Sequence, residues 1–271
     1  MTVIARSGTG PLVASPLVLQ AFLDGAVFGT SSGEGTPRVL LLHGWRRSHE
    51  DFAGVAAALA SDGLASLAID LPGFGAAPPP LEATGARGYA LRLVPLVTEL
   101  AQGGSPPVLV GHSFGGRVAV CLAAQAPEVV GGLVLTGVPL VRAEMPAGRV
   151  SRRYRAIRTA ARLGLVRDAR LEAARRHYGS ADYRAATGVV RQVLVACVGE
   201  SYEVELARVS CPVTLVWGAD DAVAPLAVAK AAQALVPAAR LDVVEGVGHL
   251  VPTEAPARLA EATRALVGEA R

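Results

Sequence analysis

The feature that most constrains this 271-residue chain is an alternation of short apolar runs with segments of helical periodicity. Six continuous, mainly apolar runs indicate strands buried on both faces, and they span residues 38–43, 63–71, 107–111, 132–138, 213–219 and 241–245. Helical spacing follows over residues 48–60, 89–100, 114–126, 227–235 and 256–267. This alternation predicts an α/β fold with a mostly parallel central sheet and helices on both faces.

Two segments depart from the alternation. Leu17–Leu23 and Ala26–Thr30, joined by Asp24-Gly25, predict an N-terminal β-hairpin with a tight turn. Residues 139–208 have helical periods and no clear strand, and they are too long for an ordinary connection. We expect them to form an inserted helical cap (lid) over the carboxyl edge of the sheet, where open α/β sheets carry their sites. The expected domains are a core of residues 1–138 and 209–271 and a cap of residues 139–208.

The expected end of the third parallel strand carries the stretch Gly111-His112-Ser113-Phe114-Gly115. It fits G-x-S-x-G, the nucleophile elbow, in which side chains at both glycines would collide with the adjoining strand and helix. The serine hydroxyl then lies at a helix N-terminus, and the Phe114 N–H points to where an oxyanion would form. Read alone, the stretch also fits a Gly/Ser turn or a phosphate loop.

Three further strand ends carry residues that would complete such a site. Trp45, in His43-Gly44-Trp45, is a candidate for a second oxyanion N–H. An acid follows a late strand at Asp220 or Asp221, and His249 follows the last strand. A serine becomes a strong nucleophile when a histidine takes its proton and a carboxylate fixes the histidine tautomer. Taken singly, each of these acids and the histidine also fits an ordinary loop residue.

Five stretches together resemble the α/β-hydrolase superfamily, over about residues 17–267: LLHGW (41–45), DLPGFG (70–75), GHSFGG (111–116), WGADDAVAP (217–225) and GVGHLVPTEAP (246–256). The order Ser…Asp…His is also that of the superfamily. Its G-x-x-D-x-x-x-P pattern selects Asp221 as the triad acid and leaves Asp220 as the fallback. Asp70 is similar to a structural loop aspartate of the superfamily.

The resemblance implies a capped serine hydrolase with the catalytic triad Ser113, Asp221 and His249 and an oxyanion hole made by the backbone N–H groups of Trp45 and Phe114. It implies cleavage of an ester, thioester or lactone bond of a small, largely apolar substrate through an acyl-enzyme on Ser113. Three alternatives stay open. They are hydrolysis of a carbon–carbon bond in a dienoic keto acid, a cofactor-free lyase or perhydrolase, and a hydrolase-fold ligand receptor without turnover.

Composition narrows the possible partners. The net charge of +3 comes from an arginine-rich sequence in which acidic residues are interspersed, and no nucleic-acid-binding module is recognised, so a nucleic-acid partner is not expected. No run of eighteen apolar residues indicates a membrane span, and no signal peptide is recognised, so a cytoplasmic location is expected. Cys121, Cys197 and Cys211 lack metal or disulfide spacing. We expect a small-molecule substrate, no cofactor and no metal; the oligomeric state stays open.

Two expectations concern the cap. Its arginines, concentrated between Arg142 and Arg191, are expected on solvated helix faces, or one of them near His177-Tyr178 holds a substrate carboxylate. Apolar cap residues are expected to roof the site: Ile157, Leu163, Leu165, Val190, Val193 and Leu194. In the core, His112 is expected to pack or hydrogen-bond behind the elbow.

Overall fold

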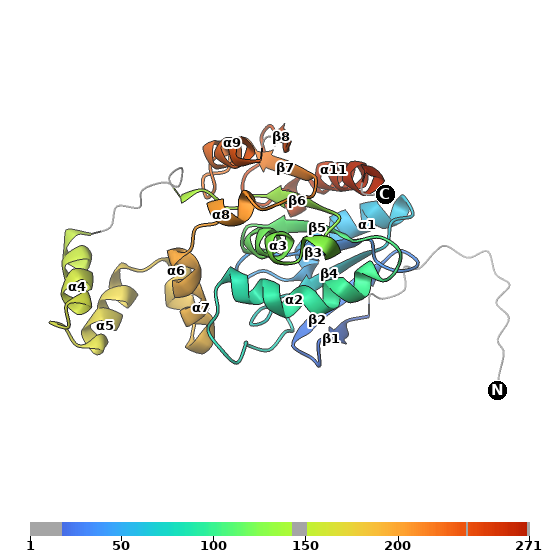
Figure 1. Ribbon diagram of the computed structural model, residues 1–271. Coiled ribbons are helices and arrows are strands. Elements are labelled where there is room, and N and C mark those ends of the chain that lie inside the picture. The colour runs from blue at the N-terminus through green and yellow to red at the C-terminus, as the bar shows by residue number, and fades with distance from the viewer. Residues whose placement is uncertain (1–17, 143–150, 237, 270–271) are drawn as a thin grey trace.

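The computed structural model describes residues 18–142, 151–236 and 238–269. Within these ranges one eight-stranded sheet has the order β1-β2-β4-β3-β5-β6-β7-β8 (Figure 1). The strands are β1 (Gln20–Phe22), β2 (Val27–Ser32), β3 (Val39–Leu42), β4 (Ser66–Asp70), β5 (Val108–His112), β6 (Gly132–Thr136), β7 (Val213–Gly218) and β8 (Arg240–Val244). From β4 to β8 all neighbours are parallel, and β1 and β2 are antiparallel, which confirms the predicted sheet.

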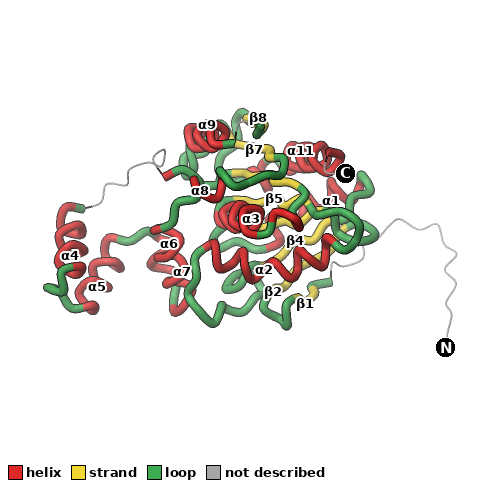
Figure 2. Tube along the Cα trace, in the orientation of Figure 1, coloured by secondary structure: helices red, strands yellow, loops and turns green. Residues whose placement is uncertain are grey.

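Alternate residues of the parallel strands face two separate cores. Leu40 and Leu42 belong to the core beneath α2 (Ala86–Ala101) and α3 (Phe114–Gln125), whereas Val39 and Leu41 belong to the core beneath α1 (Ala53–Ser61) and α11 (Pro256–Glu269). Figure 2 shows these helices in two layers with the sheet between them. Every residue of β3 to β7 is buried, because helices cover both faces of these strands.

The remaining short helices of the core connect these layers. They are the 3-10 turns η1 (His49–Phe52) and η2 (Pro127–Val129) and the helices α9 (Leu226–Leu235) and α10 (Val251–Glu254). The helix expected over residues 48–60 therefore begins as a 3-10 turn before it continues as α1. None of the described helices is both long and apolar enough to cross a bilayer.

The N-terminal hairpin forms, but its turn differs from the expected one. Phe22 pairs with Val27, so four residues connect the strands instead of two. Leu23 and Asp24 take positive φ angles of 51° and 55°, ahead of Gly25 at 80°. This register buries the Val27 side chain completely, and a shift of one residue would turn it to the opposite face.

Between β6 and β7 the described residues form five helices: α4 (Arg152–Arg162), α5 (Asp168–Tyr178), α6 (Ala181–Ala185), α7 (Gly188–Gly199) and α8 (Glu203–Leu206). The two ends of this insertion meet, because Arg142 donates from its backbone to the Glu203 carboxylate and from its guanidinium to the Gly199 carbonyl, both at 3.2 Å. Arg87 of α2 holds the returning end through the Ser201 carbonyl at 2.8 Å. The insertion is therefore closed at its base.

The helices of the insertion differ in how closely they pack on the core. Val193 and Cys197 of α7 are buried against it, and Val190 packs there in part. Leu163 and Leu165 are instead 68% and 74% exposed, so the expectation that they roof the site is wrong. They lie at the turn between α4 and α5, which stand away from the sheet beyond α6 and α7 (Figure 1). Arg149, one of the arginines of this region, lies outside the described residues.

Candidate active site

Ser113 lies at the sharp turn between β5 and α3, with φ 50° and ψ −109°. The turn is possible because its neighbours are glycines. A Cβ at Gly111 would overlap Gly116, and a Cβ at Gly115 would overlap the backbone carbonyl of Leu42. This backbone conformation is strained for a residue other than glycine, and it directs the serine hydroxyl away from the strand, at the N-terminus of α3.

Asp221 and His249, which are 28 residues apart in the sequence, meet at the same edge of the sheet. His249 Nδ1 donates to Asp221 Oδ2 at 2.8 Å, and the other carboxylate oxygen accepts from the amides of Val223 and Ala224, both at 2.8 Å. Burial alone would raise the pKa of the Asp221 carboxyl, but these hydrogen bonds outweigh it and lower the pKa below its usual value. The carboxylate is therefore held ionised and accepts a hydrogen bond from His249 Nδ1.

Gly137, directly after β6, makes room for this pair. It has φ 59°, and a Cβ there would lie 2.9 Å from the His249 ring and 3.3 Å from Asp221 Oδ2. Gly137 was not predicted as a site residue. A glycine directly after an expected strand was the available signal, but glycine is needed there because of contacts with residues more than eighty positions away.

Trp45 lies in a turn closed by the Arg47 N–H and the Gly44 carbonyl at 3.2 Å, with Arg46 at φ 58°. His43 fixes this turn: its Nδ1 donates to the Gly44 carbonyl at 2.7 Å, and its Nε2 accepts from the Leu71 amide at 3.0 Å. Because the peptide is planar and trans, holding the Gly44 carbonyl also orients the Trp45 N–H, which points the opposite way. Burial lowers the pKa of His43, so the ring stays neutral in this tautomer.

The amides of Trp45 and Phe114 are both available for a ligand. Within the described parts of the chain, neither of them donates a hydrogen bond to another residue. The two loops are adjacent, because a Cβ at Gly44 would lie 3.4 Å from the Ser113 Cβ. Two unpaired N–H donors beside a serine hydroxyl form a site that can stabilise a developing oxyanion.

His112 lies behind the elbow and is buried. Its Nε2 donates to the backbone carbonyl of His249 at 3.0 Å, and the two rings are 4.9 Å apart. Burial, with a smaller contribution from neighbouring His249, lowers the pKa of His112 to about 3, so it is neutral at physiological pH. This geometry agrees with the expected hydrogen-bonding role and ties the His249 backbone to the strand that carries Ser113.

The side chains of Trp45 and Phe114 belong to a cluster of aromatic rings. The Trp45 ring is 4.9 Å from Phe74 and 5.4 Å from Phe114, and Phe114 in turn packs edge-on against Tyr89 at 5.1 Å. Phe74 and Val190 also line a hollow of about 400 Å³ between the loop after β4 and the start of α7. Arg46 and Arg47 line the same hollow, whereas Ser113 and His249 do not.

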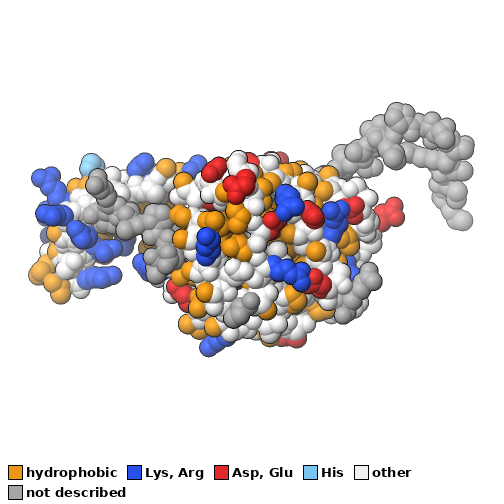
Figure 3. Space-filling model, turned by 90° about the horizontal axis from the view of Figure 1, so that it is seen from above, with side chains coloured by type: hydrophobic (Ala, Val, Ile, Leu, Met, Phe, Trp, Pro, Cys, Tyr) orange, Lys and Arg blue, Asp and Glu red, His pale blue; other side chains and the backbone are white. Residues whose placement is uncertain are grey.

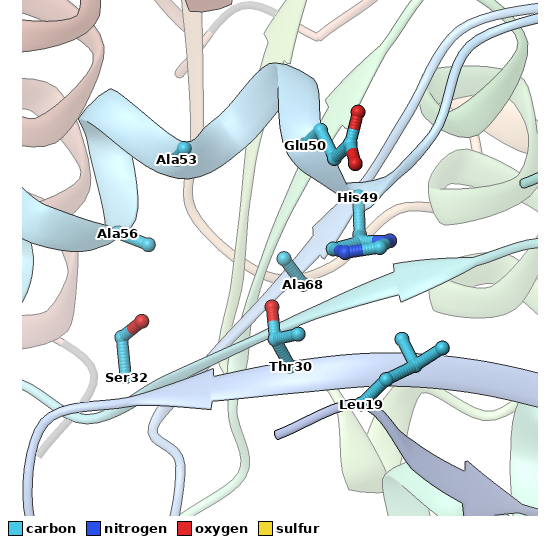
Figure 4. Close-up of a pocket in the computed structure, with 8 residues that line it drawn as sticks. All are labelled: Leu19, Thr30, Ser32, His49, Glu50, Ala53, Ala56 and Ala68. Atoms are coloured by element: carbon cyan, nitrogen blue, oxygen red, sulfur yellow. The ribbon is translucent and has the colours of Figure 1, made fainter. Parts of the chain in front are cut away.

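A second hollow of about 400 Å³ is remote from these residues. It lies between β2, β4 and the start of α1, and Figure 4 shows Thr30, Ser32, His49 and Glu50 directed toward it. Neither Ser113 nor His249 lines it. It is therefore separate from the candidate active site.

The other acids of the sequence analysis have different surroundings. Asp220 is exposed, and its carboxylate contacts no described hydrogen-bond donor. Asp70 is fully buried and accepts from the His49 amide, the His49 ring and the Ala76 amide, at 2.7, 2.9 and 2.8 Å. It therefore shapes the loop after β4, as the resemblance implied. The described residues contain no group of three or more side chains suited to a metal ion.

Comparison with known proteins agrees with this fold. The model of the alpha/beta hydrolase family matches residues 39–262. Esterase Rv0045c of Mycobacterium tuberculosis is 38% identical over 117 residues, which are 42% of this chain and 37% of the esterase. A pimeloyl-[acyl-carrier protein] methyl ester esterase of Sodalis glossinidius is 34% identical over 111 residues, 40% of this chain and 39% of that protein. The matches thus span less than half the length of either esterase.

Solved structures extend the likeness to nearly the whole chain. A serine hydrolase involved in carbazole degradation has a TM-score of 0.68 at 23% identity, over 93% of this chain and 99% of that one. At this identity the likeness concerns the fold alone. Together with the family match over most of the sequence, it completes the assignment: the chain belongs to the alpha/beta hydrolase family of enzymes.

Proposed function

We propose that this protein is a serine hydrolase that cleaves an ester, thioester or lactone bond through an acyl-enzyme on Ser113. The observation that carries the proposal is the 2.8 Å hydrogen bond between His249 and buried Asp221 at the sheet edge that also holds Ser113. A carboxylate that accepts from Nδ1–H selects the neutral tautomer in which Nε2 is the basic nitrogen, as a general base requires.

In the proposed reaction, Ser113 Oγ attacks the carbonyl carbon while its proton passes to His249 Nε2. The oxyanion then accepts hydrogen bonds from the N–H groups of Trp45 and Phe114. His249 returns the proton to the leaving oxygen or sulfur as the tetrahedral intermediate collapses to the acyl-enzyme. A water molecule, deprotonated by His249, releases the acid and restores Ser113.

Two observations support an apolar ester as the substrate class. Trp45 and Phe114, the two proposed oxyanion donors, pack their rings together, and Phe74 packs against Trp45, so we expect an apolar acyl or alcohol group beside Ser113 to meet apolar surface. Both named relatives are esterases, and the matches cover 42% and 40% of this chain. A small-molecule substrate agrees with both.

We further propose that residues 139–208 act as a cap on a core made of residues 1–138 and 209–271. Support comes from α7, whose Val193 and Cys197 pack on the core while Val190 borders the hollow beside Phe74. A cap at this position would exclude water from the site and strengthen the hydrogen bonds to the oxyanion.

The test combines a substrate panel with covalent labelling. Purified protein is assayed with p-nitrophenyl esters of increasing acyl length, thioesters, lactones and a dienoic keto acid, and is labelled with a fluorophosphonate. We expect turnover of esters and one phosphonate adduct on the peptide that contains Ser113, absent from Ser113→Ala and present in the control Ser61→Ala. Binding of esters without turnover or labelling would contradict the proposal and favour a ligand receptor. Exclusive turnover of the keto acid would favour carbon–carbon hydrolysis.

A further inference from the structure

We propose that the hairpin of α4 and α5 is a docking surface for a lipid bilayer that contains anionic phospholipid. Residues 151–179 hold nine arginines and only two carboxylates, Asp168 and Glu172. The whole chain has 26 basic and 23 acidic side chains, so acids outnumber bases outside the hairpin. The molecule is therefore electrically polarised, and its positive end is the hairpin.

Most of these arginines have no counter-charge in the described structure. Glu172 is shared by Arg175, Arg176 and Arg191, at 3.9, 3.3 and 3.2 Å. In contrast, Arg155 and Arg158 are exposed, and no described carboxylate lies within ion-pair distance of either. Like charges three and four residues apart destabilise a helix. An anionic surface would remove this repulsion.

The spacing places the basic side chains on outward faces. Tyr154 and Ile157 of α4 are half-buried, and the Tyr154 ring lies 5.9 Å from Tyr178 of α5. This packing uses the apolar side of α4. Arg155, Arg158 and Arg162, at intervals of three and four residues, are exposed on another side of the helix.

Two leucines are exposed at the tip of the hairpin, beside these arginines. Leu163 and Leu165 are 68% and 74% exposed. The tip has a defined backbone: Gly164 has φ 72°, its N–H donates to the Ala161 carbonyl at 3.0 Å, and the Leu165 N–H donates to the Ala160 carbonyl at 2.9 Å. This is the Schellman helix ending, which commonly packs its following apolar residue back on the helix. Here that residue, Leu165, is presented to solvent.

The shape of the molecule leaves this end free to meet a flat surface. Figure 3 shows basic side chains gathered at the end of the molecule that α4 and α5 form, with hydrophobic atoms among them. Exposed leucines on a hairpin with many exposed arginines suit the boundary between lipid headgroups and acyl chains, where apolar side chains insert and cations meet phosphates. A nucleic acid would match the charge, but it offers no apolar phase for the leucines.

The general arginine bias of the chain does not account for the pattern. Arginine replaces lysine nearly everywhere in this sequence, but 21 of its 23 carboxylates lie outside the hairpin. A solvated helix face of ordinary composition would contain both signs of charge. The combination of depleted carboxylates with exposed tip leucines is what points to an anionic, partly apolar partner.

The experiment measures co-sedimentation of the full chain with vesicles of phosphatidylcholine alone or mixed with phosphatidylglycerol. We expect binding to the mixed vesicles only, weakened by added salt. Each arginine near such a surface strengthens binding about fivefold, so the triple variant Arg155→Gln, Arg158→Gln, Arg162→Gln is expected to bind about 100-fold more weakly. The double variant Leu163→Ser, Leu165→Ser is expected to lose about 100-fold or more because the leucines no longer insert.

Matched controls change charge and apolarity elsewhere. The triple variant Arg208→Gln, Arg240→Gln, Arg264→Gln has the same net charge as the hairpin triple variant, and Leu81→Ser, Leu91→Ser removes two other exposed leucines. Both controls are expected to bind as the wild type does. Equal binding to both vesicle types, or equal loss in hairpin and control variants, would overturn the proposal. The proposal would also be overturned if a DNA duplex displaced the protein from the vesicles and the affinity of the protein for that duplex did not depend on Leu163 and Leu165.

Discussion

Replacing Ser113 by glycine and by alanine separates the strain at the elbow from its chemistry. The φ of 50° and ψ of −109° lie outside the regions that residues with a Cβ normally occupy. A backbone of this kind costs about 1–3 kcal/mol. Glycine removes most of that cost, but it loses more conformational entropy on folding, which destabilises the fold by about 0.5–1 kcal/mol. Ser113→Gly is therefore expected to gain about 1 kcal/mol of unfolding free energy.

A gain of this size would raise the melting temperature by about 2–4 °C in a domain of this length. Ser113→Ala keeps the Cβ and its strain, so its melting temperature is expected to stay near that of the wild type. Both variants lose Oγ, and both should lose nearly all turnover of a p-nitrophenyl ester. Calorimetry measures the first effect, and initial rates measure the second.

Two results would refute this reasoning. If Ser113→Gly melts at or below the temperature of Ser113→Ala, the backbone at this position stores no strain that the glycine relieves. If either variant retains more than about a hundredth of the wild-type rate, Ser113 is not the nucleophile, since loss of a triad member costs far more.

Three other substitutions test the surroundings of Ser113 and are measured by ester kinetics and calorimetry. Asp221→Asn should lower kcat/KM by about a thousandfold or more, whereas Asp220→Asn should leave it nearly unchanged; the reverse order would move the acid by one residue. The lowered pKa of Asp221 stabilises the fold above its usual 3.8, so the melting-temperature advantage of wild type over Asp221→Asn should shrink as the pH falls below that value. Gly115→Ala should cost about 1–3 kcal/mol because the new Cβ meets backbone atoms, and the control Gly268→Ala, with open space around it, should not destabilise. His112→Gln keeps an N–H donor for the His249 carbonyl and should retain most activity, whereas His112→Ala should lose about tenfold in kcat/KM; equal rates would deny His112 a positioning role.

The strands of the core were predictable because parallel strands buried on both faces are apolar without interruption. Each of the six expected runs overlaps a strand, and the residues at their ends do lie along one edge of the sheet. The role of His249 in the triad stays a prediction, but its meeting with Asp221 followed from topology alone, since both residues come just after neighbouring strands β7 and β8.

What the sequence did not disclose depends on contacts between distant segments. Position 137 needs glycine because the His249 ring, 112 residues later, lies against it. The role of His43 in orienting Trp45 depends on the hydrogen bond from the Leu71 amide to His43 Nε2, which joins two distant segments. Leu163 and Leu165 are apolar, but the turn that holds them, between α4 and α5, stands away from the sheet and leaves them exposed. Periodicity indicates which face of a helix is apolar, not which neighbour covers it.

The closed base of the insertion makes its contents exchangeable. Arg142 ties the outgoing chain to Gly199 and Glu203 of the returning chain, so the distance between the two ends is the same whatever lies between them. The entropic cost of lengthening such a loop grows only with the logarithm of its length. The residues proposed for the reaction, Ser113, Asp221 and His249, all lie outside it. The part that stands away from the sheet, α4 and α5, can therefore diverge, or be exchanged in the laboratory, while α7 keeps its contacts with the core.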